Sequence, residues 1–128
     1  MRTNRIEKVH TILQKMELDA CIIKGMENIF YLTGFRGSEG TLVVTKGDVF
    51  LLTDFRYITY ANEVTEGIQV IEVRRRDGGL YDICVRYGIH RLGFDCFHVT
   101  HNVYSSWTAI LPDTVELVPI DLIIEEMR

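Results

Sequence analysis

The sequence predicts an α/β fold in which a mostly parallel sheet is covered by helices on both faces. Segments with helical spacing of apolar residues alternate along the chain with short runs of apolar and β-branched residues. Two of these runs are separated by only three residues, and no internal repeat or low-complexity linker interrupts the order. Such alternation is typical of parallel strands between two helical layers, and the close pair of runs adds one antiparallel hairpin.

The length and composition indicate one ordinary globular domain. The chain has 128 residues, 47% of them hydrophobic and 25% charged, which suffices for a core without disulfide bonds. A net charge of −4 creates no global field that would recruit nucleic acid or an anionic membrane. Three cysteines without a pattern argue against a disulfide framework and for a reducing compartment. With neither a signal peptide nor a run of about 20 apolar residues, we expect a soluble cytoplasmic protein.

The first third of the chain predicts a helix, a strand and a glycine-rich loop. A helix is expected over Arg5–Met16, with Thr3 or Asn4 as its cap. Its inward residues are Ile6, Val9, Leu13 and Met16. A buried strand over 19–23 and a brief helical turn over 28–32 follow. The stretch 33–40 contains three glycines, which predict a mobile or tightly folded loop.

The middle of the chain predicts a hairpin followed by a helix and a strand. The strands are 41–45 and 49–53, joined by a turn at 46–48. Asp54 is expected to cap a helix that ends near Gly67 and is followed by a strand over 68–73. The inward face of this helix is expected to carry Phe55, Ile58 and Ala61.

Two further helices and two strands are predicted in the last third. Asp77 is expected to cap a helix that Gly88 ends, and Thr100 to cap another that Pro112 ends. The inward residues are Leu80, Ile83, Cys84 and Tyr87 in the first, and Val103, Trp107, Ile110 and Leu111 in the second. Strands are expected over 91–94 and 115–118, and Asp121 opens a last helix. This helix is cut soon after it starts, so we expect the chain to continue beyond Arg128.

One short segment carries several potential metal ligands. Asp95, Cys96, His98 and His101 lie within seven residues, and a small independent enzyme built around them is one hypothesis. The spacing matches no specific zinc pattern, and Thr100 as a helix cap would separate the two histidines. We therefore favour solvated turn residues beside a buried Cys96, with no metal site.

Other reactive or binding motifs are equally weak. The glycines of 33–40 precede a strand rather than a helix, which argues against a phosphate-binding loop. The basic run 74–76 has no aromatic stacking platform beside it, so we expect a solvated or interface surface and no nucleic acid. Cys21 and Cys84 are predicted to be inert core thiols. Ser105 and Ser106 lie mid-helix without a nucleophile elbow, so no catalytic residue is expected.

Arg56 is the one side chain whose predicted position opposes the local electrostatics. It falls in the first turn after Asp54, where the helix dipole disfavours a cation by a few tenths of a kcal/mol. This position suggests either a specific functional partner or a simple pairing with Asp54 or Glu63. Both interpretations stay open at this point.

Two stretches together resemble a known family. They are 28–35 (NIFYLTGF), followed by Gly37-Ser38, and 51–57 (LLTDFRY). In this order they are similar to the creatinase/prolidase amino-terminal domain of Xaa-Pro dipeptidases (prolidases), aminopeptidase P and creatinase. The Arg5–Met16 helix, Asp19-Ala20 and Leu92-Gly93-Phe94-Asp95 resemble it as well. The resemblance covers essentially residues 1–128.

The resemblance implies a three-layer α/β/α fold, with a mixed sheet of about six strands flanked by helices, ribonuclease H-like in type. It also implies that the chain itself is not catalytic. In the family two divalent metals, often manganese, are held by a carboxyl-terminal pita-bread domain, which is expected after residue 128. The parent enzyme would be a proline-specific metallopeptidase that cleaves proline-containing peptides. A creatinase-like amidinohydrolase and a stand-alone binding module are the alternatives.

The resemblance further implies which residues act near the active site. The amino-terminal domain of relatives contributes to dimerisation and helps to wall the active site of a second subunit. The expected partners are therefore the chain's own catalytic domain and a second copy in a homodimer. The candidates for substrate gating or for the interface are Phe35, Arg36, Gly37, Ser38, Glu39, Arg56 and Tyr57.

Overall fold

A six-stranded mixed sheet forms the centre of the molecule in the computed structural model, which describes residues 2–73 and 79–120. The strand order is β4-β3-β2-β1-β5-β6. The strands are β1 (Ala20–Ile23), β2 (Thr41–Thr45), β3 (Val49–Thr53), β4 (Gln69–Glu72), β5 (Arg91–Asp95) and β6 (Glu116–Ile120). Strand β2 runs antiparallel to β1 and β3, and the other neighbouring pairs are parallel. The predicted hairpin and the predicted mixed sheet are confirmed, but the antiparallel pairing of β2 with β1 was not expected.

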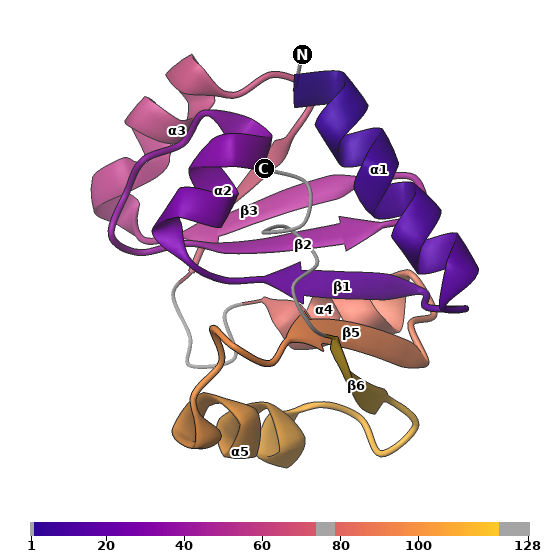
Figure 1. Cartoon of the computed structure of the whole chain (residues 1–128). Coiled ribbons are helices and arrows are strands. Elements are labelled where there is room, and N and C mark those ends of the chain that lie inside the picture. The colour runs from indigo at the N-terminus through magenta and orange to yellow at the C-terminus, as the bar shows by residue number, and fades with distance from the viewer. Residues whose placement is uncertain (1, 74–78, 121–128) are drawn as a thin grey trace.

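Helices cover both faces of this sheet, as predicted. They are α1 (Arg2–Lys15), α2 (Met26–Thr33), α3 (Ile58–Val64), α4 (Leu80–Arg86) and α5 (His101–Ile110), with a 3-10 turn at Phe55–Tyr57. Figure 1 shows α1 and α2 in front of the sheet and α4 behind it. Side chains of α1, α2 and α3 pack on one face, and those of α4 and α5 on the other. The fold therefore has three layers.

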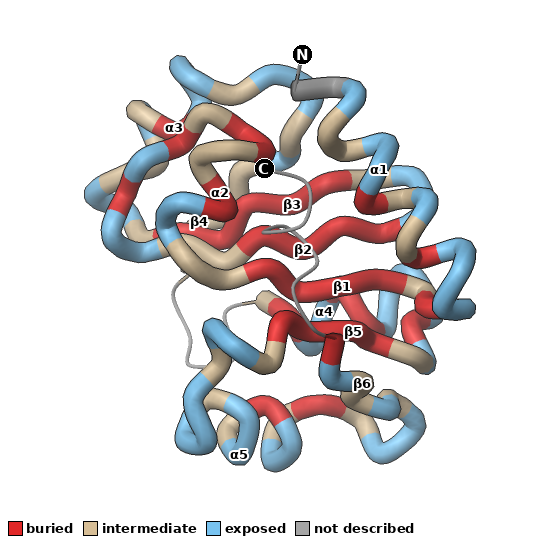
Figure 2. Tube along the Cα trace, in the orientation of Figure 1, coloured by how far each residue is buried: buried red, intermediate tan, exposed pale blue. Residues whose placement is uncertain are grey.

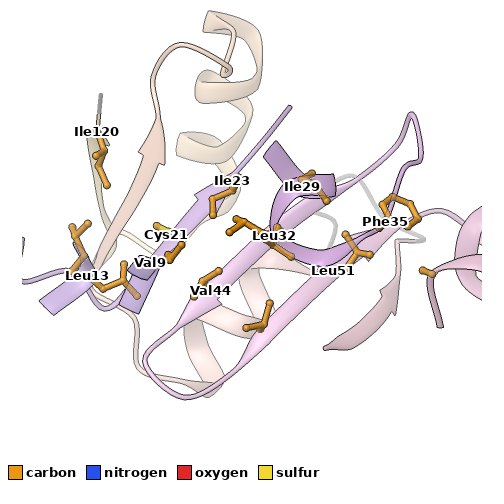
Figure 3. Close-up of a cluster of buried hydrophobic side chains, with 14 residues drawn as sticks. Val9, Leu13, Cys21, Ile23, Ile29, Leu32, Phe35, Val44, Leu51 and Ile120 are labelled. Carbon is orange, nitrogen blue, oxygen red and sulfur yellow. The ribbon is translucent and has the colours of Figure 1, made fainter. Parts of the chain in front are cut away.

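The core is divided by the sheet because successive strand residues point to opposite faces. Figure 2 shows the central strands almost entirely buried. Val9 and Leu13 of α1 meet Cys21 and Val44 on one face, and Figure 3 shows this cluster. On the opposite face, Ile22 packs among residues of α4 and α5. Strands buried on both faces explain the continuous apolar runs in the sequence.

Asp19 fastens the start of β1 to the start of β5. Its carboxylate accepts hydrogen bonds at 2.9 Å from the backbone N–H groups of His90 and Arg91. Partial burial raises the pKa of this carboxyl, but the two hydrogen bonds and nearby Lys46 outweigh it, so the pKa is below its usual value. A polar residue thus specifies the pairing of two strands that are far apart in the sequence.

Several details of the sequence prediction are wrong at the ends of elements. Helix α1 begins at Arg2, so Thr3 and Asn4 lie inside it rather than at the expected cap position. It ends at Lys15, and Glu17 adopts a left-handed φ of 55° that turns the chain towards β1. Met16 therefore leaves the inward face and is 39% exposed. The spacing of apolar residues thus predicted which face of this helix is buried, but it did not predict where the helix begins and ends.

Three other helix predictions are corrected. Helix α2 has eight residues, where only a brief turn over 28–32 was expected. Phe55 lies in the 3-10 turn before α3 and not in the helix itself. Its side chain therefore does not join the predicted inward face and is 74% exposed. Tyr87 follows the end of α4, which leaves it 37% exposed. Its ring still contacts that of Phe50, with 5.3 Å between the ring centroids.

The caps were predicted with mixed success. Thr100 caps α5 by accepting a hydrogen bond from the backbone N–H of Val103, and Asp54 accepts one from that of Arg56. Helix α4 has Gly79 as its N-cap residue, and the predicted cap Asp77 lies outside the described residues. The basic run 74–76 and the predicted helix from Asp121 also lie outside them.

Candidate functional site

The candidate loop leaves α2 through a tight left-handed turn. Gly34 ends this helix with a φ of 85°, and its N–H donates to the carbonyl of Phe30 at 2.8 Å. The buried Thr33 hydroxyl donates to the carbonyl of Ile29 at 2.7 Å and accepts from the N–H of Phe35 at 3.0 Å. This arrangement favours glycine at position 34 and directs the next side chain into the core.

Phe35 anchors the loop to the domain. Its ring is 1% exposed and contacts Tyr57 edge-on at 5.9 Å and Tyr60 at 5.5 Å, measured between ring centroids. Gly37 lies directly over the same ring, where a Cβ atom would be only 2.4 Å from Cζ of Phe35. The loop is therefore a packed structure, and the position above the ring requires glycine.

We expect Gly37→Ala to lower the free energy of unfolding by about 1–3 kcal/mol, the usual cost of overpacking a filled site. The added methyl group would have to displace an aromatic ring that is itself buried. Denaturant unfolding of the purified chain measures this loss. Gly47→Ala is the matched control, since no atom lies within 4 Å of its Cβ position. Equal midpoints for both variants would contradict the packing described here.

Polar contacts hold the exposed part of the loop against α3. The hydroxyl groups of Ser38 and Tyr57 lie 2.7 Å apart, and the N–H of Arg36 donates to the hydroxyl of Tyr60 at 3.2 Å. The Arg36 guanidinium stacks over the ring of Phe30 with 3.9 Å between Cζ and the ring centroid. These contacts fix the loop at three points while the Arg36 side chain remains exposed.

Arg56 pairs with its own cap residue. Its guanidinium lies 2.7 Å from a carboxylate oxygen of Asp54 and donates from both Nε and Nη2. These hydrogen bonds lower the pKa of Asp54 and raise that of Arg56. Of the two interpretations left open by the sequence, the structure favours the local pairing. Because both side chains are solvated, this ion pair adds little stability.

The end of the loop that precedes β2 is held by hydrogen bonds from residues of the sheet and of the segment after β1. The hydroxyl of Thr53 donates to the backbone carbonyl of Glu39. Lys24, which follows β1, donates from Nζ to the carbonyl of Gly40 at 3.2 Å and to the hydroxyl of Thr41 at 2.9 Å. Partial burial lowers the pKa of Lys24, and the nearby Glu39 carboxylate opposes this effect. The Glu39 side chain itself is exposed.

The structure brings the predicted candidates together around the buried Phe35 ring. Phe35, Gly37 and Ser38 contact one another or Tyr57, and Arg56 lies over the Tyr57 ring at 5.3 Å from its centroid. The sequence analysis missed Phe30, Tyr60 and Lys24, which hold the loop from three different elements. The spacing of Tyr57 and Tyr60 on one helical face was the available signal for the second of these.

The segment after β5 forms a polar pair rather than a cluster. Asp95 is 1% exposed and accepts hydrogen bonds from the N–H of Phe97 at 2.9 Å and from Nδ1 of His98 at 2.6 Å. Cys96 is half-buried, not buried as expected, because its side chain follows the end of the strand. Within residues 2–73 and 79–120, no three His, Cys, Asp or Glu side chains lie close enough to hold a metal ion.

The remaining nucleophile candidates have the environments that were predicted. Burial raises the pKa of the Cys21 thiol to about 12 and that of Cys84 to about 11, so both stay protonated and inert at neutral pH. Ser105 and Ser106 lie within α5. In the part of the chain that the structure describes, no helix is long and apolar enough to span a membrane.

Known proteins resemble this chain over nearly its whole length. The family model described as "Creatinase/Prolidase N-terminal domain" matches residues 5–128. The uncharacterized peptidase YqhT of Bacillus subtilis is 33% identical, with a match that covers 97% of this chain but 35% of YqhT. The chain thus spans about a third of the length of that relative.

Solved structures agree with the sequence comparison. An Xaa-Pro aminopeptidase (aminopeptidase P) from Streptococcus thermophilus superposes with a TM-score of 0.90 at 30% identity, covering 99% of this chain and 98% of that one. The N-terminal domain of the cytoplasmic peptidase PepQ from Mycobacterium tuberculosis gives 0.88 at 31% identity, with 98% of each chain covered. The predicted three-layer fold and the predicted resemblance are thereby confirmed. The chain belongs to the creatinase/prolidase N-terminal domain family.

Proposed function

We propose that this chain is the non-catalytic amino-terminal domain of an Xaa-Pro dipeptidase or aminopeptidase P-type metallopeptidase. The observation that carries the proposal is the match to YqhT, which covers 97% of this chain and 35% of the relative. A peptidase about three times as long leaves room for a separate catalytic domain. The same fold in relatives described as Xaa-Pro aminopeptidase and as cytoplasmic peptidase supports this assignment and a cytoplasmic location.

The residues that the structure describes do not fit a two-metal centre. Such a centre needs several carboxylate and imidazole ligands around each ion. Among the described residues, Asp95 and His98 form one carboxylate–imidazole pair, in which Nδ1 already faces the carboxylate, and no group of three such side chains could hold a metal ion. We therefore propose that both divalent metals, manganese in the family resemblance, are held by a domain beyond residue 128. The chain shapes access to them and performs no step itself.

The loop 34–40 is suited to gating because it is held in place while its charges are exposed. Phe35 is buried, Ser38 contacts Tyr57, and Thr53 fastens the Glu39 backbone. A segment fixed at several points loses little entropy when a substrate meets it. Exposed Arg36 and Glu39 would then present opposite charges to the ends of a short peptide.

A second subunit is the other expected partner of this surface. Phe55, next to Arg56, is 74% exposed, and Phe97 is 63% exposed. Phe55 follows the end of β3 and Phe97 the end of β5, and these parallel-running strands end at the same edge of the sheet as the gating loop. Exposed aromatic residues are enriched in protein interfaces. We propose that this edge faces the second copy of a homodimer, where it would line that copy's active site.

The test measures peptide hydrolysis by the full-length protein with Arg36→Ala and, separately, Glu39→Ala. We expect KM for Xaa-Pro dipeptides to rise about 3- to 10-fold, roughly 0.7–1.4 kcal/mol, with kcat little changed. For longer Xaa-Pro peptides the rise in KM should be smaller, because their second terminus lies farther from the loop. Arg86→Ala on α4 and Glu66→Ala after α3 are the matched exposed controls. Unchanged kinetics for both peptide lengths would remove the gating role.

A further inference from the structure

Strands β1 and β5 form a topological switch point at the carboxyl edge of the sheet. They are parallel neighbours, with Ile22 opposite Phe94. The connection after β1 passes through α2, which packs with α1, whereas the connection after β5 passes through α5 on the opposite face. In open α/β sheets, neighbouring parallel strands whose connections diverge leave a crevice at their carboxyl ends where ligands bind.

A cleft of about 260 Å³ opens at this edge, on the side covered by α4 and α5; it lies beside the ends of β1 and β3 and the start of β2, and its link to β5 is through α5. Its walls come from Lys24 after β1, from the end of β3 at Thr53, from Leu80 of α4 and from Trp107 of α5. Sites for drug-sized ligands measure about 300–1,000 Å³. The cleft therefore suits a smaller molecule, of the size of an amino acid.

One wall of the cleft carries a half-buried cation. The Lys24 ammonium has three N–H donors, and its two hydrogen bonds within the described residues go to the carbonyl of Gly40 and the hydroxyl of Thr41. One donor remains for a ligand. A partly desolvated ammonium gains most from a carboxylate, because a charge-assisted hydrogen bond offsets the lost hydration.

The other walls supply a carboxylate and an apolar surface. Glu39 and Asp54 both line the cleft; Asp54 is already paired with Arg56, whereas Glu39 is exposed and its negative charge acts on Lys24. Leu52, Leu80 and Trp107 are buried residues that present apolar surface to the same cleft. A positive group, a negative group and an apolar wall thus converge on one small volume.

We propose that this cleft binds an apolar α-amino acid in its zwitterionic form. The ligand carboxylate meets Nζ of Lys24, its ammonium meets the Glu39 carboxylate, and its side chain lies against Trp107. This site goes beyond the proposed peptidase function. Although it shares Glu39 with the gating loop, its test uses this chain alone and measures binding, so either proposal can fail without the other.

The test is a titration of the purified chain with L-leucine, followed by intrinsic fluorescence and by calorimetry. Relatives of the same length form this fold by themselves, so the chain is suited to the experiment. Trp107 is the single tryptophan of the sequence and lines the cleft, so its emission reports occupancy. We expect a saturable change. We expect at least tenfold weaker binding of 4-methylpentanoate, which lacks the ammonium, and of 3-methylbutylamine, which lacks the carboxylate.

Two variants with matched controls locate the binding. Lys24→Met should weaken leucine binding at least tenfold. The control Lys15→Met, at an exposed position of α1, should not change it. Ser106→Leu, which fills the cleft and leaves Lys24 in place, should also abolish binding. Ser105→Leu, one residue away and exposed, should not. The proposal is overturned by the absence of a saturable response, by equal binding of either analogue, or by unchanged affinity in Ser106→Leu.

Discussion

Phe35→Ala is expected to lower the free energy of unfolding by about 3–5 kcal/mol, the usual cost of removing a buried phenylalanine. The ring is 1% exposed and fills the space between Tyr57, Tyr60 and Gly37. Its loss leaves a cavity, and the surrounding loop can collapse into it only partly, because Thr33 and Thr53 hold both ends. Guanidinium chloride unfolding, followed by circular dichroism, measures the change.

Phe55→Ala is the matched control for this experiment. It removes the same side chain from the 3-10 turn close to Tyr57, but Phe55 is 74% exposed. A substitution at such a position usually changes stability by no more than about 0.5 kcal/mol. If the two variants lost equal stability, the loop would not be anchored through Phe35. The gating proposal would then lack its rigid support.

The layered fold was predictable because local patterns agree with the tertiary arrangement. The continuous apolar runs of β1 and β3 indicated strands covered on both faces, and the short turn between 45 and 49 indicated the antiparallel pair. Thr100 and Asp54 were recognisable as caps, since their side chains act within three residues. Features that depend on neighbours in the sequence were therefore the ones that the sequence predicted.

The errors occur where contacts between distant residues decide. Helix α2 is short and its apolar residues pack against α1, so its length depends on a tertiary contact that the local pattern does not show. Ser38 meets Tyr57 across 19 residues, and Lys24 meets Thr41 across 17. No spacing rule predicts such pairs from a single sequence. The candidate residues were found by family resemblance, but the residues that hold them required the structure.

Asp95→Ala is expected to lower the free energy of unfolding by about 1–3 kcal/mol, because it leaves two donors without their acceptor. The carboxylate is 1% exposed and lies at the end of β5, where it accepts from the N–H of Phe97 and from the imidazole of His98. A carboxylate can only accept, so the facing Nδ1 of His98 carries a proton. The pair thereby closes the turn between β5 and α5, and the His98 ring lies beside Gly25 in the connection from β1 to α2.

The effect of Asp95 is separated from a general loss of charge by Asp113→Ala. Asp113 is exposed in the connection between α5 and β6, so we expect its removal to change stability by no more than about 0.5 kcal/mol. Asp95→Asn should lie between the two, since an amide oxygen can still accept from one of the two donors. Equal stability of all three variants would show that the turn is held by packing alone. A graded loss would instead show that this buried carboxylate stabilises the fold.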